Sequence, residues 1–362
     1  MASHFRRLTI KDIRRETPDC VSIAFAVPPE LQEEFRYRHG QNITLKIKLE
    51  GEEIRRSYSI CSSPLESELR IAVKKISNGK FSNHANNKLR KGVELEVLPP
   101  TGKFYTELNP SNRKNYLALA AGSGITPLLS IIKTTLATEP GSSFTLVYGN
   151  RTRSSIIFKE QLEGLKNQYM NRFSLYHILS REKTEFSINQ GRIDPDKCAQ
   201  LGKTLIDFQK TDEIFICGPE EMILSLKNWF EDQKIEKKKI HFELFTVPGE
   251  KHLTIDNPVL ANRPKQDGKI SKVTVKSDGV YFDFDLEFDG ESILEAALKR
   301  GADLPFACKS GVCSSCRAKL ITGEVEMDVN YALEPEELNA GFILTCQSHP
   351  VSDKLMVDYD VK

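Results

Sequence analysis

The stretch Pro305-Phe-Ala-Cys308-Lys-Ser-Gly-Val-Cys313-Ser-Ser-Cys316-Arg-Ala-Lys-Leu320 decides the fold of the C-terminal part of the chain. Its cysteines follow the pattern C-x4-C-x2-C, and Cys346 comes after a further 29 residues. This spacing is typical of a 2Fe-2S cluster, in which each of two irons takes two thiolates. Zinc sites usually pair their ligands in two short C-x2-C spacings, and four unrelated cysteines are the simplest alternative. The spacing predicts that Cys308, Cys313, Cys316 and Cys346 hold an iron-sulfur cluster.

The residues around this loop predict a small domain of strands and a helix. In residues 281–289, aromatic and aliphatic side chains alternate with acidic ones, which indicates a half-buried strand. Ser292-Ile-Leu-Glu295 has the form of a capping box and predicts a helix through Leu298. The cluster loop resembles that of plant-type ferredoxins. This resemblance implies a β-grasp ferredoxin domain over residues 269–362, with the fourth cysteine brought back from a distant strand.

Two further domains and a linker are expected upstream. Residues 247–268 contain three prolines and two glycines without a sustained hydrophobic period, which predicts a linker. Residues 1–110 contain short strand-like stretches separated by turn signals, which favours an antiparallel β-barrel. In residues 111–246, strands alternate with helix-compatible stretches, which predicts an α/β domain with a parallel sheet. The strands expected in these two segments are 5–14, 20–27, 42–49, 53–59, 68–75, 93–98, 116–121, 144–148, 173–178 and 213–217.

Charge and cysteine content narrow the class of protein. The net charge is +1, but residues 269–362 hold ten Lys and Arg against seventeen Asp and Glu, which gives −7 and leaves +8 for the rest. An acidic module tethered to a basic remainder suits electrostatic docking, although an acidic surface also serves solubility. Basic and acidic residues are interleaved, so no nucleic-acid partner is indicated. With four scattered cysteines, no signal peptide and no apolar run of about 18 residues, we expect a cytoplasmic protein without a membrane partner.

Two motifs in the first segment suit a flavin. Arg56-Ser-Tyr58-Ser59 ends a predicted strand, and Gly79-Lys80-Phe81-Ser82 follows after Val73-Lys74. They resemble the R-x-Y-S and G-x-x-S motifs of the ferredoxin-NADP reductase family, which implies FAD binding. In this resemblance Arg56 clamps a phosphate, Tyr58 lies against the flavin ring and Ser59 reaches the reactive flavin nitrogen.

The second of these motifs is expected to bind the pyrophosphate of FAD. Gly79 lets the backbone approach the pyrophosphate, and Lys74 or Lys80, together with Ser82, helps to satisfy its charge. The neighbouring Val73 and Phe81 are included in the same predicted site.

The second segment carries three motifs of the same reductase family. Gly122-Ser-Gly124-Ile-Thr126-Pro follows a strand and precedes a helix-like run, as in a loop whose amides face a pyrophosphate. It lacks the third glycine of the dehydrogenase fingerprint, which argues against an ordinary Rossmann dehydrogenase. Cys217-Gly218-Pro resembles the motif whose cysteine lies beside the nicotinamide, with a buried strand cysteine as the alternative. Glu243-Leu-Phe245 resembles the acidic and aromatic pair that flanks the flavin, with Phe in place of the usual Tyr; Phe245 as a core residue is the alternative.

The choice of nucleotide is predicted from Ser180-Arg181-Glu182. In plant-type reductases the corresponding residues bind the 2′-phosphate of NADPH, and a phosphate needs a cation more than a hydroxyl does. Arg151 is expected at the same nucleotide. NADPH is therefore favoured, with NADH as the second candidate; a solvated pair of Arg181 with Glu182 is the alternative interpretation.

The order of flavin, nucleotide and ferredoxin segments resembles that of oxygenase reductases along essentially the whole chain. Among these, the strings around residues 79–83, 148–152 and 217–222 are most similar to the reductases of phenylacetyl-coenzyme A epoxidase systems. This resemblance implies an enzyme that passes electrons from NADPH through FAD and a 2Fe-2S cluster to an oxygenase. Ser59, Cys217 and Glu243 are its expected catalytic residues. The alternatives are the reductase of a 3-ketosteroid, alkane or ring hydroxylase, a general ferredoxin-NADP reductase-like carrier, and a redox-sensing module without nicotinamide turnover.

Overall fold

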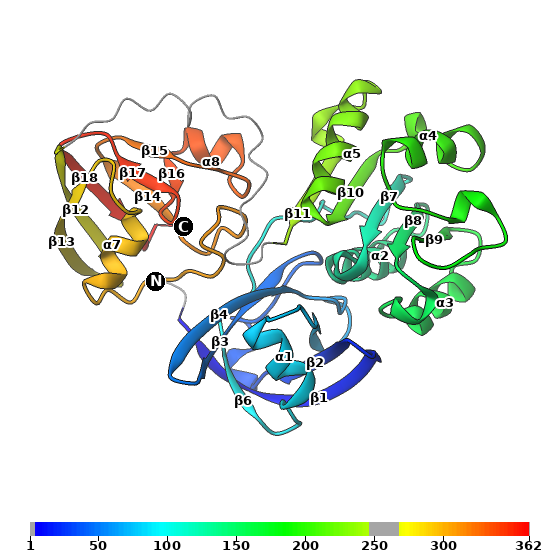
Figure 1. Cartoon of the computed structure of the whole chain (residues 1–362), viewed down its shortest axis with the longest axis horizontal. Coiled ribbons are helices and arrows are strands. Elements are labelled where there is room, and N and C mark those ends of the chain that lie inside the picture. Colours follow the sequence, from blue (N-terminus) through cyan, green and yellow to red (C-terminus); the bar gives the residue numbers. More distant parts are fainter. Residues whose placement is uncertain (1–3, 246–267, 362) are drawn as a thin grey trace.

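A computed structural model describes residues 4–245 and 268–361 of the chain (Figure 1). The described residues form three units, each built around its own sheet and hydrophobic core. The predicted linker, residues 247–268, lies outside the described residues except for Gly268. The predicted fold class, an antiparallel barrel, an α/β unit and a β-grasp unit in one chain, is confirmed.

The first unit is an antiparallel sheet that closes on itself. Its strands lie in the order β4-β3-β6-β1-β2-β5, and every pair of neighbours is antiparallel. A bridge between Ile60 and Ile71 joins the end of β4 to β5 and so completes the barrel. Alternate apolar side chains, such as Leu8, Ile23 and Leu45, fill its interior. The elements are β1 (Arg6–Thr17), β2 (Cys20–Ala26), β3 (Asn42–Leu49), β4 (Glu52–Ser59), β5 (Leu69–Lys74), α1 (Lys80–Asn87) and β6 (Glu94–Val97).

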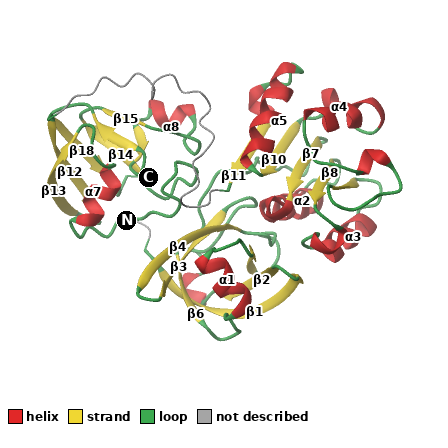
Figure 2. Cartoon of the chain, in the orientation of Figure 1, coloured by secondary structure: helices red, strands yellow, loops and turns green. Residues whose placement is uncertain are grey.

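The second unit is a parallel sheet in the order β11-β10-β7-β8-β9 (Figure 1), and Figure 2 shows its strands in yellow among red helices. Helices α2 and α3 pack on one face, and α4 and α5 pack on the other. Strand β11 was not among the predicted strands, because its five residues mix apolar with polar side chains. The elements are β7 (Asn115–Ala121), α2 (Ile125–Thr138), β8 (Ser143–Asn150), α3 (Lys159–Gln168), β9 (Phe173–Leu179), α4 (Pro195–Thr204), β10 (Glu213–Gly218), α5 (Glu220–Asp232) and β11 (Ile240–Leu244).

The third unit is a mixed sheet in the order β13-β12-β18-β14-β16, with α7 packed on it. The Ser292 hydroxyl accepts a hydrogen bond of 3.4 Å from the Glu295 N–H and so caps α7, which is one half of the predicted capping box, whereas the Glu295 carboxylate lies 3.7 Å from Lys309. Cys346 lies in the turn between β16 and β17, and the expectation that a strand carries it was wrong. The elements are β12 (Ile270–Ser277), β13 (Val280–Glu287), α7 (Ile293–Lys299), β14 (Arg317–Thr322), β15 (Val325–Met327), α8 (Pro335–Asn339), β16 (Phe342–Leu344), β17 (Ser348–Pro350) and β18 (Lys354–Asp358).

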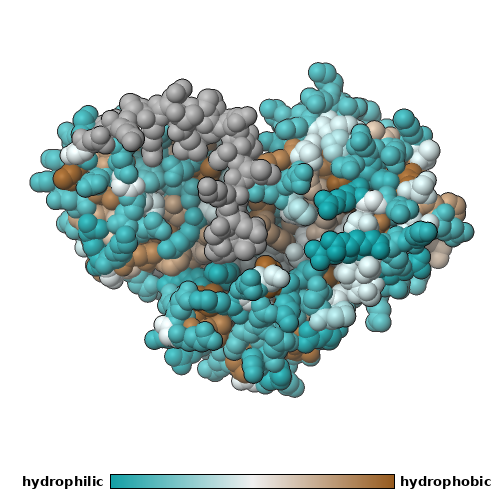
Figure 3. Space-filling view, viewed as in Figure 1, coloured by the Kyte–Doolittle hydropathy of each residue, from teal (hydrophilic) through white to brown (hydrophobic). Residues whose placement is uncertain are grey.

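Hydrophilic side chains cover most of the face seen in Figure 3, with apolar residues scattered among them. Within the part of the chain that the structure describes, no helix is long and apolar enough to cross a bilayer. Most of the apolar side chains of the sheets are buried inside the three units.

Candidate electron-transfer site

Strands β7 and β10 meet at their carboxyl ends, where the strand order of the parallel sheet reverses. Open α/β sheets bind ligands at such a point. The loop Gly122–Gly124 follows β7, and a Cβ atom at Gly124 would lie 2.0 Å from the carbonyl oxygen of Cys217. Only glycine allows this approach, so the loop rests directly on the end of β10. Cys217 is fully buried there.

The end of β4 reaches the same place from the barrel. The hydroxyl of Ser59 donates a hydrogen bond of 2.7 Å to Oε2 of Glu243 on β11. Glu243 is the neighbour of Cys217 in the β10–β11 ladder. Three residues predicted from separate motifs, Ser59, Cys217 and Glu243, are thus brought together between the barrel and the parallel sheet.

Burial raises the pKa of Glu243 to about 7, although hydrogen bonds from Ser59 and Asn42 act in the opposite direction. Burial thus favours the protonated form of this carboxyl group compared with an exposed glutamate. The sequence analysis missed Asn42, which begins β3 and carries no motif. Phe245, two residues after Glu243, is exposed at the end of the described segment.

The R-x-Y-S motif lies on β4 as expected. The ring of Tyr58 packs beside that of Phe81, with 5.5 Å between their centroids. Nη1 of Arg56 donates to the carbonyl oxygen of Arg55 at 2.7 Å. The backbone of Val73 accepts a hydrogen bond of 3.0 Å from Asn86 on α1, so α1 is fixed against β5.

Gly79 is the N-cap of α1, and the hydroxyl of Ser82 shapes this turn. It accepts from the N–H of Ile76 at 3.1 Å and donates to the carbonyl oxygen of Gly79 at 3.3 Å. A Cβ atom at Gly79 would lie 2.5 Å from that hydroxyl, so a side chain here would fill the turn. The exposed start of α1 offers N–H groups to an anion. Lys80 pairs with Glu52 at the surface.

Lys74, at the end of β5, lies close to the loop Gly122–Gly124. A Cβ atom at Gly122 would lie 3.6 Å from the Lys74 Nζ, and Gly122 has a φ of +55°. On the other side of the loop, Tyr148 donates a hydrogen bond of 2.8 Å to the carbonyl oxygen of Gly122. The hydroxyl of Thr126 donates to the carbonyl oxygen of Ser123 at 3.0 Å, and Gly218 packs against Met222. These contacts fix the shape of the loop that precedes α2.

Arg151 and Arg181 follow β8 and β9. The backbone N–H of Ser180 donates to Asn150 at 3.0 Å, and that of Arg181 donates to Arg151 at 2.9 Å. The ladder therefore continues past both strands and sets the two arginines side by side. Both are exposed, and neither guanidinium has a hydrogen bond or an ion pair within residues 4–245 and 268–361. The alternative interpretation, a solvated pair of Arg181 with Glu182, does not occur, because Glu182 binds the side chain and the N–H of Arg153 at 3.2 and 2.8 Å.

The cysteine loop arranges its thiols in two pairs. The N–H of Cys308 donates to Sγ of Cys313 at 3.4 Å, and the neighbouring Cys346 is the main cause that raises the pKa of the Cys316 thiol well above its ordinary value. Among the described residues, no three His, Cys, Asp or Glu side chains converge on a point that would suit one metal ion. Two irons that take two thiolates each fit two such pairs. Gly311, with φ +74°, makes the tight turn in this loop, where a Cβ atom would lie 2.9 Å from Val329.

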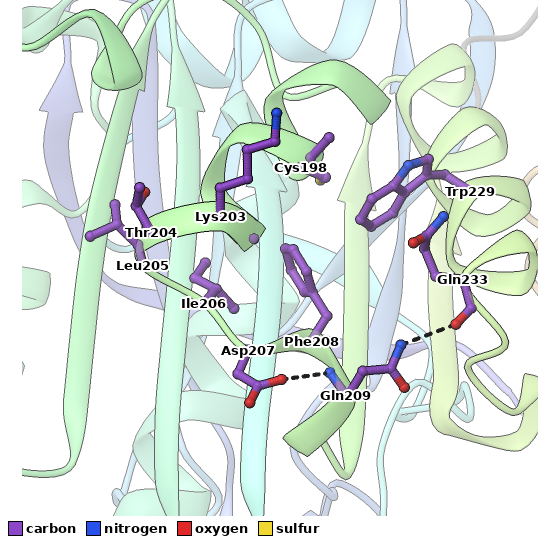
Figure 4. A pocket seen from close by; sticks show the side chains of 12 residues that line it. Cys198, Lys203, Thr204, Leu205, Ile206, Asp207, Phe208, Gln209, Trp229 and Gln233 are labelled. Atoms are coloured by element: carbon purple, nitrogen blue, oxygen red, sulfur yellow. Dashed lines mark hydrogen bonds between the residues drawn. The ribbon is translucent and has the colours of Figure 1, made fainter.

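A cavity of about 680 Å³ lies away from these residues (Figure 4). Its lining comes from the ends of α4 and α5 and from the segment before β10, at the opposite edge of the parallel sheet from Cys217. Asp207 caps Gln209 at 3.2 Å, and Gln209 donates to the carbonyl oxygen of Gln233 at 3.1 Å. None of the residues singled out in the sequence analysis as a site residue lines this cavity.

Comparison with known protein families matches all three units. Residues 7–105 match the oxidoreductase FAD-binding domain, residues 118–228 the oxidoreductase NAD-binding domain and residues 275–351 the 2Fe-2S iron-sulfur cluster binding domain. A component of 1,2-phenylacetyl-CoA epoxidase from Escherichia coli (strain K12) is 46% identical over 99% of this chain and 98% of its own length. The chain belongs to the oxygenase reductase family. This reductase is also 32% identical, over 97% of its length and 96% of the relative, to the ferredoxin reductase component of 3-ketosteroid-9-alpha-monooxygenase from Rhodococcus rhodochrous.

The solved structures agree on the fold. Phthalate dioxygenase reductase superposes with a TM-score of 0.58 over 98% of both chains, at 24% sequence identity. The reductase described here is therefore an electron-transfer oxidoreductase with FAD-binding, NAD-binding and 2Fe-2S domains, which serves as a component of an oxygenase system.

The residues present fit these three groups. The cofactors supply the redox chemistry, hydride transfer from a nicotinamide to a flavin and one-electron transfer to the cluster. The chain would hold the flavin with Arg56, Tyr58 and the start of α1, and the cluster with the four paired cysteines. Ser59 and Glu243 place a hydroxyl and a titrating carboxyl group between the flavin barrel and the nucleotide sheet.

Proposed function

We propose that this chain is the reductase of a phenylacetyl-CoA epoxidase, which passes electrons from NADPH to the oxygenase of that system. The observation that carries the proposal is the 46% identity to the Escherichia coli epoxidase component across nearly the full length of both chains. The 3-ketosteroid monooxygenase reductases have the same span but reach only 32% to 33% identity. We further propose that the flavin, nucleotide and ferredoxin domains span residues 1–110, 111–246 and 269–362. The protein and its oxygenase partner are proposed to meet in the cytoplasm.

The preference for NADPH is supported by charge at the ends of β8 and β9. Arg151 and Arg181 offer two exposed guanidinium groups, and the nearby acid, Glu182, is bound by Arg153. A 2′-phosphate gains charge-assisted hydrogen bonds in such surroundings, whereas a 2′-hydroxyl gains little. Ser180 adds a hydroxyl at the same edge.

The roles proposed for the hydride site follow from burial and hydrogen bonding. Glu243, with a pKa near 7, accepts the Ser59 hydrogen bond and can release or take up a proton next to the flavin. Burial raises the pKa of Cys217 well above its ordinary value, so it stays a neutral thiol and shapes the nicotinamide pocket without adding charge. The residues proposed to bind the flavin are Arg56, Tyr58, Lys74 and Gly79. Those proposed to contact the nucleotide are Gly122, Gly124, Thr126 and Gly218.

The test is reconstitution with two oxygenases. The purified reductase is mixed with the oxygenase component of phenylacetyl-CoA epoxidase or with the 3-ketosteroid 9α-oxygenase, and product is measured under NADPH and under NADH. We expect epoxide formation with the first oxygenase and NADPH. Turnover with the steroid oxygenase alone would contradict the proposed partner, and faster turnover with NADH would contradict the nucleotide preference. Absence of dye reduction with both nucleotides would support the redox-sensing alternative.

A further inference from the structure

Two basic side chains of the flavin barrel extend into the ferredoxin unit. They are Arg55 on β4 and Lys103 in the segment after β6. Arg55 is only 7% exposed although it lies on the outer side of its strand, next to the predicted phosphate ligand Arg56. A buried arginine is costly unless its donors are satisfied. The groups that satisfy its donors therefore indicate the role of Arg55.

Three partners of Arg55 come from the start of the cluster loop and the residues just before it, and a fourth comes from its own strand. Nη1 donates a hydrogen bond of 3.1 Å to the carbonyl oxygen of Leu304, and Nη2 lies 3.6 Å from Asp303. The guanidinium also stacks on the ring of Phe306, 4.2 Å from its centroid. Glu53, on the same strand, accepts from Nε at 2.8 Å. Phe306 is two residues before Cys308, so this contact acts directly on the loop that carries three cluster cysteines.

Lys103 makes the second contact between the barrel and the ferredoxin unit. Its Nζ lies 2.8 Å from Oε2 of Glu337 on α8, and the other oxygen of Glu337 binds Arg317. Arg317 directly follows Cys316. Burial pushes the pKa of Glu337 upward, but the hydrogen bonds from Lys103 and Arg317 outweigh it and hold the pKa below its ordinary value. The bridge is therefore ionised at neutral pH, and it links the barrel to Arg317, the residue that follows Cys316.

The nucleotide unit supports the same loop from a third direction. Val312, immediately before Cys313, and Tyr331 pack against the core shared by α4, α5 and β10. Phe306 and Val312 thus touch the reductase part of the chain close to Cys308 and Cys313, and Arg317, next to Cys316, is linked to it through Glu337. The fourth cysteine, Cys346, lies in the turn after β16.

We propose that Arg55 and Lys103 are positioning residues for electron transfer within the chain, because they hold the ferredoxin unit with its cluster loop toward the flavin strand β4. The inference rests on the proposed path from flavin to cluster. Neither residue touches a reacting atom. Their effect is on the distance and orientation between two redox groups, to which the rate of such a step is sensitive.

The test compares two matched double variants of the full-length holoprotein. The double variant Arg55→Lys with Lys103→Ala loses the guanidinium group that stacks on Phe306 and the ion pair between Lys103 and Glu337. The control is the double variant Arg172→Lys with Lys114→Ala, whose contacts all lie inside the nucleotide unit. Arg172 donates to carbonyl oxygens and stacks on Tyr169, as Arg55 does with its own partners, and Lys114 pairs with the half-buried Glu213. The first readout is the radius of gyration from solution X-ray scattering. The second is stopped-flow reduction of the flavin and of the cluster by NADPH.

We expect the first double variant to have a larger radius of gyration than wild type and slower cluster reduction, on the order of tenfold or more. Its flavin reduction and its FAD and iron contents should equal those of wild type. The control variant should match wild type in both readouts. Cluster reduction at the wild-type rate, or an unchanged radius of gyration, would overturn the proposal. If wild type itself fails to reduce its flavin with NADPH, the proposed function fails, and scattering still decides the docking.

A variant on the ferredoxin side guards against a loss of FAD caused by changing β4. Phe306→Leu removes the ring under Arg55 and leaves the barrel sequence intact. Combined with Lys103→Ala it should reproduce the larger radius of gyration and the slower cluster reduction, while the paramagnetic spectrum of the reduced cluster stays that of wild type. Normal scattering and normal electron transfer in this variant would also overturn the proposal.

Discussion

The hydroxyl of Ser59 donates a hydrogen bond of 2.7 Å to the carboxylate of Glu243, a residue 184 positions later in the chain. This bond joins the flavin barrel to the last strand of the nucleotide sheet. It also puts the carboxyl group in a place where burial raises its pKa to about 7. The protonation state of Glu243 therefore affects the stability of the contact between the two units.

The first prediction concerns pH and stability. Because the folded pKa of Glu243 is raised from 4.5 to about 7, the folded chain keeps a proton that the unfolded chain has lost. Its contribution to stability is full below pH 4.5 and falls as pH rises to about 7, by at most about 3 kcal/mol. Glu243→Gln removes this titration, so thermal melting should favour the variant over wild type increasingly from pH 5 to pH 8. If the difference in melting temperature between the variant and wild type stayed constant from pH 5 to pH 8, Glu243 would not titrate in this range.

The second prediction tests the cluster ligands. Cys346→Ser should remove or destabilise the cluster, because one iron loses half of its thiolate ligands from the protein. Reduction of ferricyanide by NADPH should persist, since that acceptor takes electrons directly from the flavin. Iron content, the paramagnetic spectrum and ferricyanide rates are measured together. Two irons with an unchanged spectrum would refute the ligand assignment. Cys198→Ser is the control, because Cys198 is buried in α4 of the nucleotide unit.

The third prediction tests nucleotide choice. Arg181→Ala should weaken NADPH much more than NADH, through the loss of a charge-assisted pair that is worth roughly 1.5 to 3 kcal/mol, or about ten- to a hundredfold in kcat/KM. Steady-state kinetics with both nucleotides measure the difference. Lys183→Ala, two positions later and also exposed, is the control. Equal losses for the two nucleotides, or a wild type that prefers NADH, would contradict the assignment.

The fourth prediction concerns the partner. The ferredoxin segment from residue 269 carries a net charge of −7, so its contact with an oxygenase should weaken as salt rises. NADPH oxidation coupled to the oxygenase is measured across a salt series, beside ferricyanide reduction. We expect only the coupled rate to fall. A parallel fall of both rates would place the effect inside this chain, and two constant rates would assign the acidic surface to solubility.

The sequence was most informative where chemistry depends on residues close together in the chain. The cysteine loop, the Gly122–Gly124 turn and the Arg56–Ser59 strand all carry their signal within a few positions, and ten predicted strands match those of the structure within a few residues. Strand β11 has no such signal. It is short, and only its pairing with β10 makes it a strand.

Contacts between distant segments could not be foreseen. The hydrogen bond from Arg55 to Leu304 spans 249 positions, and nothing in the residues around either partner marks it. Asn42 likewise reaches Glu243 only because the barrel brings β3 beside β4 and the parallel sheet. The charge difference between the two halves pointed toward docking, but the pairs that use it, Lys103 with Glu337 and Arg55 with Asp303, depend on the fold.

The contacts that Arg55 and Lys103 make have a consequence for how tightly the ferredoxin unit needs to bind. Because it is part of the same polypeptide, its effective concentration at the barrel is on the order of millimolar. An intrinsic dissociation constant of about 1 mM, roughly 4 kcal/mol, then suffices to keep half of the molecules docked. A few hydrogen bonds and one stacked ring are enough for this. An association of this strength would let the ferredoxin unit separate readily, so that it could receive electrons at the flavin and then deliver them to an external acceptor.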